Sequence, residues 1–305
     1  MICKYCGKRC SAGKTYCTNC GKPLVDGASP VQIIYIYKRI KWYWYVLAFV
    51  VGFVIYCMIW KATGNAAGPA DQTPISSLNV GDTYVFGSYE QDGNKRNGAE
   101  PIEWVVLKKD GAQALLISRY ILDAMAYESS GSDITWNESS IRKWLNGDFY
   151  EKAFSGAEKS NIILTQHDNP NSFDFYDTDY TLIHFGEDTA GKGNGADGGE
   201  ETSDKVFLLA WNEALEYFGE DADRKALTTT YAKEDGVYHV AKENYEKDGW
   251  DETMIGNGIW WLRSPGGSSA SAMSIYYDGR IHNNPVDASY EGVRPVIWVT
   301  DNLGM

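Results

Sequence analysis

The sequence predicts an α+β domain outside the cell, preceded by a small zinc ribbon and one transmembrane helix. Three observations predict this arrangement. Five of the six cysteines lie within the first 20 residues, residues 42–60 contain no charged side chain, and the remaining chain alternates strand-like segments with a few helical ones. The expected parts are a ribbon over 1–24, a basic linker over 25–41, a transmembrane helix over 42–60, a flexible linker over 61–75 and an extracytoplasmic α+β domain over 76–302.

The charge distribution supports a division of the chain between two surroundings. The 305-residue chain has a formal net charge of −13. Residues 1–61 contain nine lysines and arginines and one acid, which gives a net charge of +8. Residues 62–305 contain 19 lysines and arginines and 40 acids, which gives a net charge of −21. Such a split indicates that the two parts face different environments.

The cysteines of the first segment form two pairs with equal spacing. Cys3 and Cys6 lie in the frame CKYCGK, and Cys17 and Cys20 lie in the frame CTNCGK. The glycine after each pair lets backbone amides turn toward the thiolates, and two such turns supply the four thiolates of a structural Zn²⁺ site. The segment resembles the short zinc ribbons at the N-termini of many bacterial membrane proteins. Cys10 falls outside both frames and is expected to be a spare thiol.

Redox pairs and a disulfide cluster are the alternatives for these cysteines. Zinc is favoured because about 24 residues bury too little surface to fold without a metal or a covalent link. Most ribbons this short are structural or bind protein. Nucleic acid is therefore the less favoured partner, although the lysines of the segment would suit it.

The apolar run 42–60 has the length of a membrane-spanning helix. Nineteen residues at about 1.5 Å each approach the ~30 Å hydrocarbon layer, and aromatic residues lie at both ends. Lys38, Arg39 and Lys41 precede the run, and only Lys61 follows it closely, so the N-terminus is predicted to be cytoplasmic. A cleaved signal peptide is the alternative, but the run is longer than a typical signal core. The chain is therefore expected in the cell membrane, with its C-terminal domain outside.

The remaining residues predict the elements of the large domain in chain order. Glycine-rich turns separate apolar segments, and the helical segments begin at residues that can cap a helix, Ser139 or Ser140 and Asn212. Strands are expected over 81–89, 101–111, 112–120, 205–211, 258–265, 272–281 and 292–299, and helices over 139–154 and 212–218. This is not the regular alternation of a nucleotide-binding sheet.

Several of these segments together resemble a known family. The motifs FGSYEQDGN, EPIEWVVL, TWNESSIRKWLNGDFYEKAF, DKVFLLAWNEALEYF, WWLRSPGG and GVRPVIWV occur in this order and are similar to the bacterial domain of unknown function 6273 over residues 76–300. That resemblance implies no activity. The C-terminal strands and their glycine-rich hairpin are also similar to the C-type-lectin-like fold of formylglycine-generating-enzyme relatives. The chemistry of those enzymes is not implied, because their copper-binding cysteines have no counterpart here.

The segment WWLRSPGG supplies the candidate ligand-binding residues of the large domain. Strand alternation places Trp260 and Leu262 on one face, and Trp261 and Arg263 on the other. Arg294 lies in another expected strand. The structural interpretation, which is preferred, pairs both arginines with internal carboxylates and places Trp261 in the core. The alternative is a ligand platform, with Trp261 stacking on a ligand and the arginines holding an anionic or hydroxylated group.

Three functions are compatible with the sequence, and a binding or sensing module with an unknown extracellular ligand or protein partner is favoured. The second is an extracytoplasmic enzyme acting on cell-surface carbohydrate, which would need two suitably spaced carboxylates. The third is a membrane-tethered regulator whose ribbon binds nucleic acid. Binding is favoured over catalysis because no nucleophile and base can be paired. Ser140 and Lys143 match the spacing of an acylating serine, but the other motifs of such enzymes are absent.

Overall fold

A computed structural model describes residues 1–24, 73–131, 133–181, 195–243 and 251–301. They fall into two units, one on either side of the boundary between residues 66 and 67, and each is considered by itself. The predicted basic linker, the transmembrane segment 42–60 and most of the flexible linker lie outside the described residues. Within the described ranges, no helix has the length and apolar character needed to cross a membrane.

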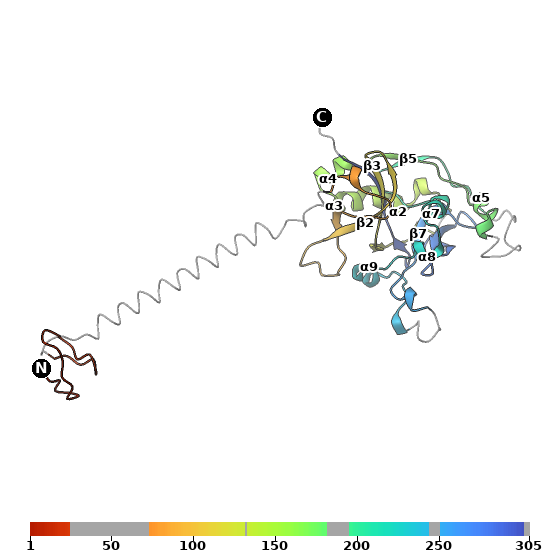
Figure 1. Ribbon diagram of the computed structural model, residues 1–305. Coiled ribbons are helices and arrows are strands. Elements are labelled where there is room, and N and C mark those ends of the chain that lie inside the picture. The colour runs from red at the N-terminus through yellow and green to blue at the C-terminus, as the bar shows by residue number, and fades with distance from the viewer. Residues whose placement is uncertain (25–72, 132, 182–194, 244–250, 302–305) are drawn as a thin grey trace. The chain divides into compact units, whose positions relative to one another are not determined.

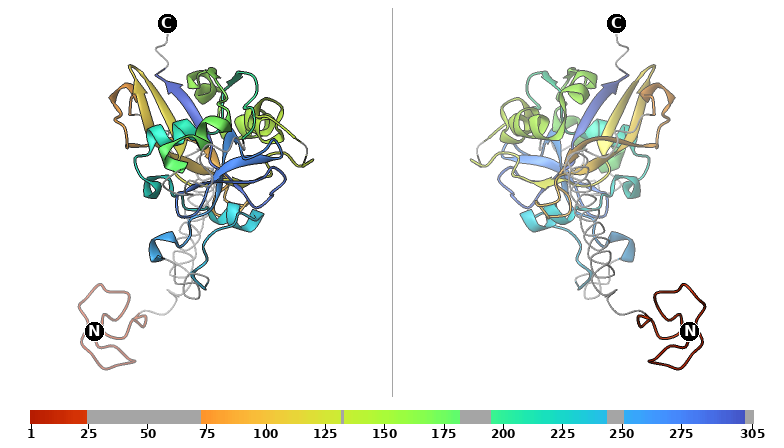
Figure 2. Two further views of the ribbon diagram at one scale, coloured as in Figure 1. Left: turned by 90° about the vertical axis from the view of Figure 1, so that its right-hand side faces the viewer. Right: turned by 90° about the vertical axis from the view of Figure 1, so that its left-hand side faces the viewer.

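The large unit has the predicted mixed α+β architecture, and its first sheet has four antiparallel strands (Figure 1). The last strand pairs with the third, with Val296 opposite Ile117 and Thr300 opposite Gln113. Figure 2 shows this blue strand beside the yellow strands of the same sheet. In sheet order, the strands are β1 (Thr83–Tyr89), β2 (Glu100–Asp110), β3 (Gln113–Ser118) and β11 (Val296–Thr300).

The second sheet has five strands and contains the segment WWLRSPGG in its central strand, β7. Its one parallel pair joins β10 to β7, with Gly292 opposite Trp260. A separate two-stranded ribbon joins His167 to Thr202. The strands of the larger sheet are β4 (Asp123–Ala124), β10 (Gly292–Val293), β7 (Trp260–Pro265), β8 (Ser271–Ile275) and β9 (Ile281–Pro285), and those of the ribbon are β5 (Thr165–His167) and β6 (Thr202–Asp204).

The segment GVRPVIWV, predicted as one strand, is divided between the two sheets. Gly292 and Val293 pair in the second sheet, and Val296 begins the strand in the first. Pro295 lies at the change of sheet, where it has no N–H to donate and its carbonyl accepts a 2.9 Å hydrogen bond from the Ser118 N–H. The proline therefore marks a crossing between sheets rather than a position within one strand.

The described helices are short, and the longest helical stretch among the described residues begins with the predicted cap. The Ser139 side chain accepts from the Arg142 N–H at 3.3 Å, and the stretch then contains a π-helical turn. The helices are η1 (Ile75–Ser77), η2 (Trp136–Glu138), α2 (Ser140–Trp144), the π turn η3 (Leu145–Phe149), α3 (Tyr150–Ala153), α4 (Gly156–Asn161), α5 (Ser172–Tyr176), α7 (Trp211–Tyr217), α8 (Asp221–Arg224), α9 (Thr230–Asp235) and η4 (Glu252–Met254).

Two predictions near residue 210 are wrong. The segment 205–211 is buried over most of its length but is not a strand, and only Phe207 forms a bridge, to Val296. The following helix begins at Trp211 rather than after a cap at Asn212, because the Glu213 side chain accepts from the Ala210 N–H at 2.9 Å. Apolar composition predicted burial here, but the backbone finds its partners outside a regular ladder.

The central strand of the second sheet is buried on both faces. All six residues from Trp260 to Pro265 are buried, although alternation alone predicts one inward face. Trp260, Trp261 and Leu262 are each 0% exposed and belong to the main hydrophobic core. Such a strand carries polar side chains only where they find partners inside the domain.

Candidate functional site

The four predicted zinc ligands lie together in the N-terminal unit. The sulfur atoms of Cys3, Cys6, Cys17 and Cys20 all lie within 4.8 Å of one another. The Cys3 and Cys20 sulfurs are 3.7 Å apart, and those of Cys6 and Cys17 are 3.6 Å apart. Tetrahedral Zn–S bonds of about 2.3 Å place sulfurs about 3.8 Å apart, so this thiol set fits Zn²⁺.

Two similar backbone turns bring these sulfurs together. The Gly7 N–H donates to the Cys3 carbonyl at 2.9 Å, and the Gly21 N–H donates to the Cys17 carbonyl at 2.8 Å. Both glycines have a positive φ, +69° and +73°, a region that other residues adopt only at a cost. The glycine in each CxxCGK frame is therefore required by the turn, as the sequence predicted.

Cys10 lies beside this cluster but outside the group of four. It is 7% exposed, and its thiol donates to the Cys17 sulfur at 3.5 Å. Hydrogen bonds from the backbone N–H groups of Cys20 and Asn19 lower the pKa of Cys17 to about 6, which favours the thiolate that binds a metal. Cys10 packs with Cys3 and Cys17 in the small core of the ribbon, so its burial is structural.

In the large unit, Arg263 has the internal carboxylate partner that the structural interpretation predicted. It is 1% exposed, and its two terminal nitrogens lie 2.5 and 2.9 Å from the carboxylate oxygens of Glu213 on α7. It also donates to the carbonyl oxygens of Leu208 at 2.8 Å and Asp168 at 3.1 Å. Burial opposes ionisation of Glu213, but Arg263 outweighs it, and the pKa of this carboxyl is lowered.

Trp261 and Arg294 are also buried, at 0% and 4% exposed. The Trp261 indole N–H donates to the Met125 carbonyl at 2.8 Å. Among the residues that the structure describes, Arg294 forms no ion pair with a carboxylate, contrary to the prediction. It donates to the Ser118 carbonyl at 2.8 Å and lies 5.0 Å from the ring centroid of Trp260. Burial lowers its pKa to about 9. The three candidates therefore present no common surface for a ligand in this structure.

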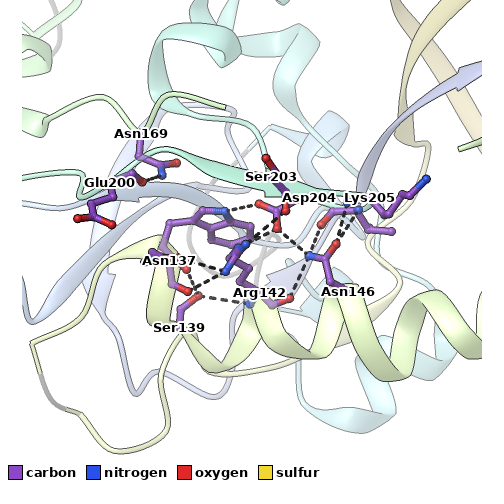
Figure 3. A network of polar contacts seen from close by, with 11 residues as sticks. Asn137, Ser139, Arg142, Asn146, Asn169, Glu200, Ser203, Asp204 and Lys205 are labelled. Carbon is purple, nitrogen blue, oxygen red and sulfur yellow. Dashed lines mark hydrogen bonds and ion pairs between the residues drawn. The ribbon is translucent and has the colours of Figure 1, made fainter. Parts of the chain in front are cut away.

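A polar network that the sequence did not suggest connects α2 with β6 (Figure 3). Asp204 is 1% exposed and accepts hydrogen bonds from Trp136 at 3.0 Å, Arg142 at 2.7 Å and Asn146 at 3.2 Å. The Asn146 amide also bonds to the backbone of Val206. The network satisfies the buried charge of Asp204 and fixes the helix against the two-stranded β5–β6 ribbon, which is a structural role.

Three carboxylates, two in the loop between β1 and β2 and one at the start of β2, form another group. Those of Glu90, Asp92 and Glu100 lie within 4.8 Å of one another. Asp92 is exposed, and its carboxylate accepts from Asn94 and Asn97 in the same loop. Exposed acidic groups of this kind are common without an ion, so we assign no metal to them.

A pocket of about 520 Å³ forms around α8 and the turn between β8 and β9. The residues that line it come from three separate parts of the chain. They are Tyr180, Leu215, Phe218, Gly219, Glu220, Asp221, Ala222, Arg224, Lys225 and Asp278. No local pattern in the sequence predicts this pocket, because no single segment contributes all of its lining residues.

Arg224 lines the pocket, and hydrogen bonds fix both its side chain and its backbone carbonyl. It is 2% exposed, its guanidinium pairs with Asp221, and its Nε donates to the Gly279 carbonyl at 2.9 Å. Its own carbonyl accepts from the Trp260 indole at 3.3 Å and from Arg294 at 3.4 Å. Trp260 of WWLRSPGG and Arg294 of GVRPV thus fix the backbone behind the pocket.

Contacts also fix Tyr180 and the turn between β8 and β9 against α8. The Tyr180 hydroxyl accepts from the Ile281 N–H at 2.9 Å and donates to Asp221 at 3.3 Å. Gly279 has a φ of +91°, and a Cβ there would lie 1.7 Å from the Asp221 carbonyl oxygen. Only glycine allows this close approach, so the turn and α8 form a preorganised wall.

The comparisons with known proteins agree with the resemblance in the large domain. Residues 111–301 match the family described as a domain of unknown function (DUF6273). No curated protein and no solved structure matches the chain. The C-type-lectin-like expectation therefore stays a prediction.

Proposed function

The chain belongs to the DUF6273 family, and from that premise we propose a membrane-anchored binding or sensing protein. A structural zinc ribbon at residues 1–24 lies in the cytoplasm, residues 42–60 cross the membrane once, and the family domain binds a ligand outside the cell. The observation that carries the proposal is the four-thiol cluster, whose sulfur separations of 3.6 and 3.7 Å suit tetrahedral Zn²⁺. A thiolate site suits a reducing compartment, which supports a cytoplasmic ribbon.

The charge asymmetry supports the same orientation. Residues 1–61 have a net charge of +8, and residues 62–305 have a net charge of −21. Basic residues before an apolar segment favour the cytoplasmic side. The chain contains no cysteine after Cys57, so the family domain is free of cysteine, as suits an oxidising exterior.

Ligand binding is favoured over catalysis by the chemistry of the pocket around α8. Among its lining residues there is no serine, cysteine or histidine. Asp221 is paired with Arg224, and Asp278 is paired with Arg280. Carboxylates held in this way suit the orientation of a bound ligand better than proton donation to it.

Metal analysis of the full chain in detergent tests the ribbon. Elemental analysis is expected to give about one zinc per chain. Replacing both Cys17 and Cys20 by serine removes half of the thiol set and should abolish zinc binding, whereas the matched control Cys57→Ser, outside the ribbon, should retain it. Full zinc content in the double variant would overturn the assignment.

Protease treatment of intact protoplasts tests the orientation. The protease is expected to digest residues 76–302 and to spare a tag fused to the N-terminus. Digestion of the tag with protection of the family domain would reverse the topology. Recovery of the family domain from the medium would instead indicate cleavage after the apolar segment.

A further inference from the structure

The geometry points to a neutral saccharide as the ligand of the pocket around α8. This inference rests on the proposed binding function and names the chemical class of the ligand. It depends on three properties of the pocket: charges of both signs in nearly equal number, apolar surface beside polar groups, and a wall held by contacts within the protein.

The lining of the pocket carries charges of both signs in nearly equal number. Glu220, Asp221 and Asp278 supply three carboxylates, and Arg224 and Lys225 supply two cations. Next to the lining, Arg280 pairs with Asp278, its Nε 2.7 Å from the carboxylate. Because the two signs differ by only one charge, the lining offers little net electrostatic attraction for an ion.

The polar groups suit hydroxyls, which both donate and accept hydrogen bonds. Carboxylate oxygens accept from a hydroxyl, and guanidinium or ammonium groups donate to it. The pocket places Asp221 directly beside Arg224, so one ligand carrying adjacent hydroxyls can use both kinds of partner. A simple apolar ligand would make no hydrogen bonds to these groups and would displace water from them, so it would bind less well.

Apolar side chains complete the pocket. Leu215 and Phe218 line it together with Tyr180, whose ring lies 5.5 Å from the Arg224 guanidinium carbon. A sugar ring combines C–H faces with hydroxyl edges, which matches apolar surface beside paired charges. The volume of about 520 Å³ is within the usual range for a small-molecule site.

Contacts within the protein hold the wall of the pocket in place. Tyr180 and Arg224 both bond to Asp221, and Gly279 brings the β8–β9 turn against the same residue. Preorganised groups lose little conformational freedom on binding, which matters for a weak, hydroxyl-based interaction.

Titration calorimetry on the full chain in detergent tests this inference. The probes are N-acetylglucosamine, glucose and their β-1,4-linked disaccharides, with glutamate and lysine as charged probes of similar size. The Ala222→Trp variant fills the pocket from an exposed lining position, and Ala157→Trp, on the exposed surface of α4, is the matched control. Circular dichroism of both variants checks that the fold is retained.

We expect at least one saccharide to bind, with its affinity reduced by about tenfold or more in Ala222→Trp and unchanged in Ala157→Trp. Saccharide binding that Ala222→Trp leaves unchanged would overturn the assignment to this pocket. Binding of glutamate or lysine alone, with the same sensitivity to Ala222→Trp, would overturn the saccharide class and leave the proposed binding function standing. Absence of binding by every probe would overturn the inference, while the zinc and topology experiments decide the rest of the proposed function separately.

Discussion

The ion pair between Arg263 and Glu213 allows a quantitative test of how the family domain is held together. Arg263→Ala removes a guanidinium that is 1% exposed and leaves the Glu213 side chain, 19% exposed, without its cation. Breaking a buried pair by removing one partner costs about 3–5 kcal/mol. Since Glu213 retains some access to solvent, we expect about 3 kcal/mol. In a domain of this size, that loss lowers the Tm by roughly 6–12 °C.

Thermal unfolding of the full chain, followed by circular dichroism, measures the effect. Arg119→Ala is the matched control, because Arg119 pairs with Glu103 at 3.0 Å but is 48% exposed. A surface pair contributes about 1 kcal/mol or less, so its loss should change the Tm by only a few degrees. The double variant Arg263→Met with Glu213→Gln should be less destabilised than Arg263→Ala, because no buried charge is left unpaired.

The pH dependence gives a second measurement of the same pair. Burial opposes ionisation of Glu213, but Arg263 outweighs it and lowers the folded-state pKa. The stabilisation is therefore present above the unfolded pKa, near 4.3, and is lost as the pH falls through the folded value. The difference between Arg263→Ala and the wild type should shrink in acid. Equal Tm losses for Arg263→Ala and Arg119→Ala at neutral pH would refute the structural role of the buried pair.

Three further predictions concern other parts of the chain. Cys10→Ser should retain about one zinc per chain in elemental analysis, because Cys10 lies outside the group of four thiols, and loss of the metal would make it a ligand. Burial raises the pKa of Glu291 to about 8. The contribution of protonated Glu291 to the free energy of unfolding is therefore fully present below about pH 4.5. It decreases by about 1.4 kcal/mol per pH unit as the pH rises toward 8. Glu291→Gln should flatten this dependence in urea unfolding, and an unchanged slope would contradict the assignment. Gly279→Ala should lower the free energy of unfolding by more than about 1 kcal/mol, because its Cβ would meet a backbone oxygen, whereas a Cβ at Gly219 has its nearest contact at 3.8 Å. Equal effects of Gly279→Ala and Gly219→Ala would contradict that reasoning.

Local signals in the sequence predicted the features that depend on neighbouring residues. The spacing of Cys3, Cys6, Cys17 and Cys20, with a glycine after each pair, predicted a cluster that the structure contains, since the turn chemistry is local. Ser139 was one of two expected caps and is the one observed. These predictions succeeded because each depends on a few consecutive residues.

Features that depend on distant partners could not be predicted in this way. The segment 205–211 has the composition of a strand, but its backbone bonds to Asn146 and to Val296 instead of a continuous neighbour. The pocket around α8 joins Tyr180, the segment 215–225 and Asp278, and no pattern within one segment reveals that they meet. Composition reports burial, whereas the tertiary fold decides which groups a buried segment contacts.

The two arginines of the C-terminal motifs show why residue type and strand context do not determine a role. Arg263 finds a carboxylate on α7, whereas Arg294 is held by the Ser118 carbonyl and the face of Trp260. Burial lowers the pKa of Arg294 to about 9, so these carbonyl and ring contacts offset only part of its desolvation. Arg294 also lies 5.8 Å from the ring centroid of Phe218 and donates to the carbonyl of Arg224, and both of these residues line the pocket. The motif that the sequence suggested as a ligand platform therefore lies behind the lining of the pocket, where Trp260 and Arg294 bond to the Arg224 carbonyl and fix the backbone there.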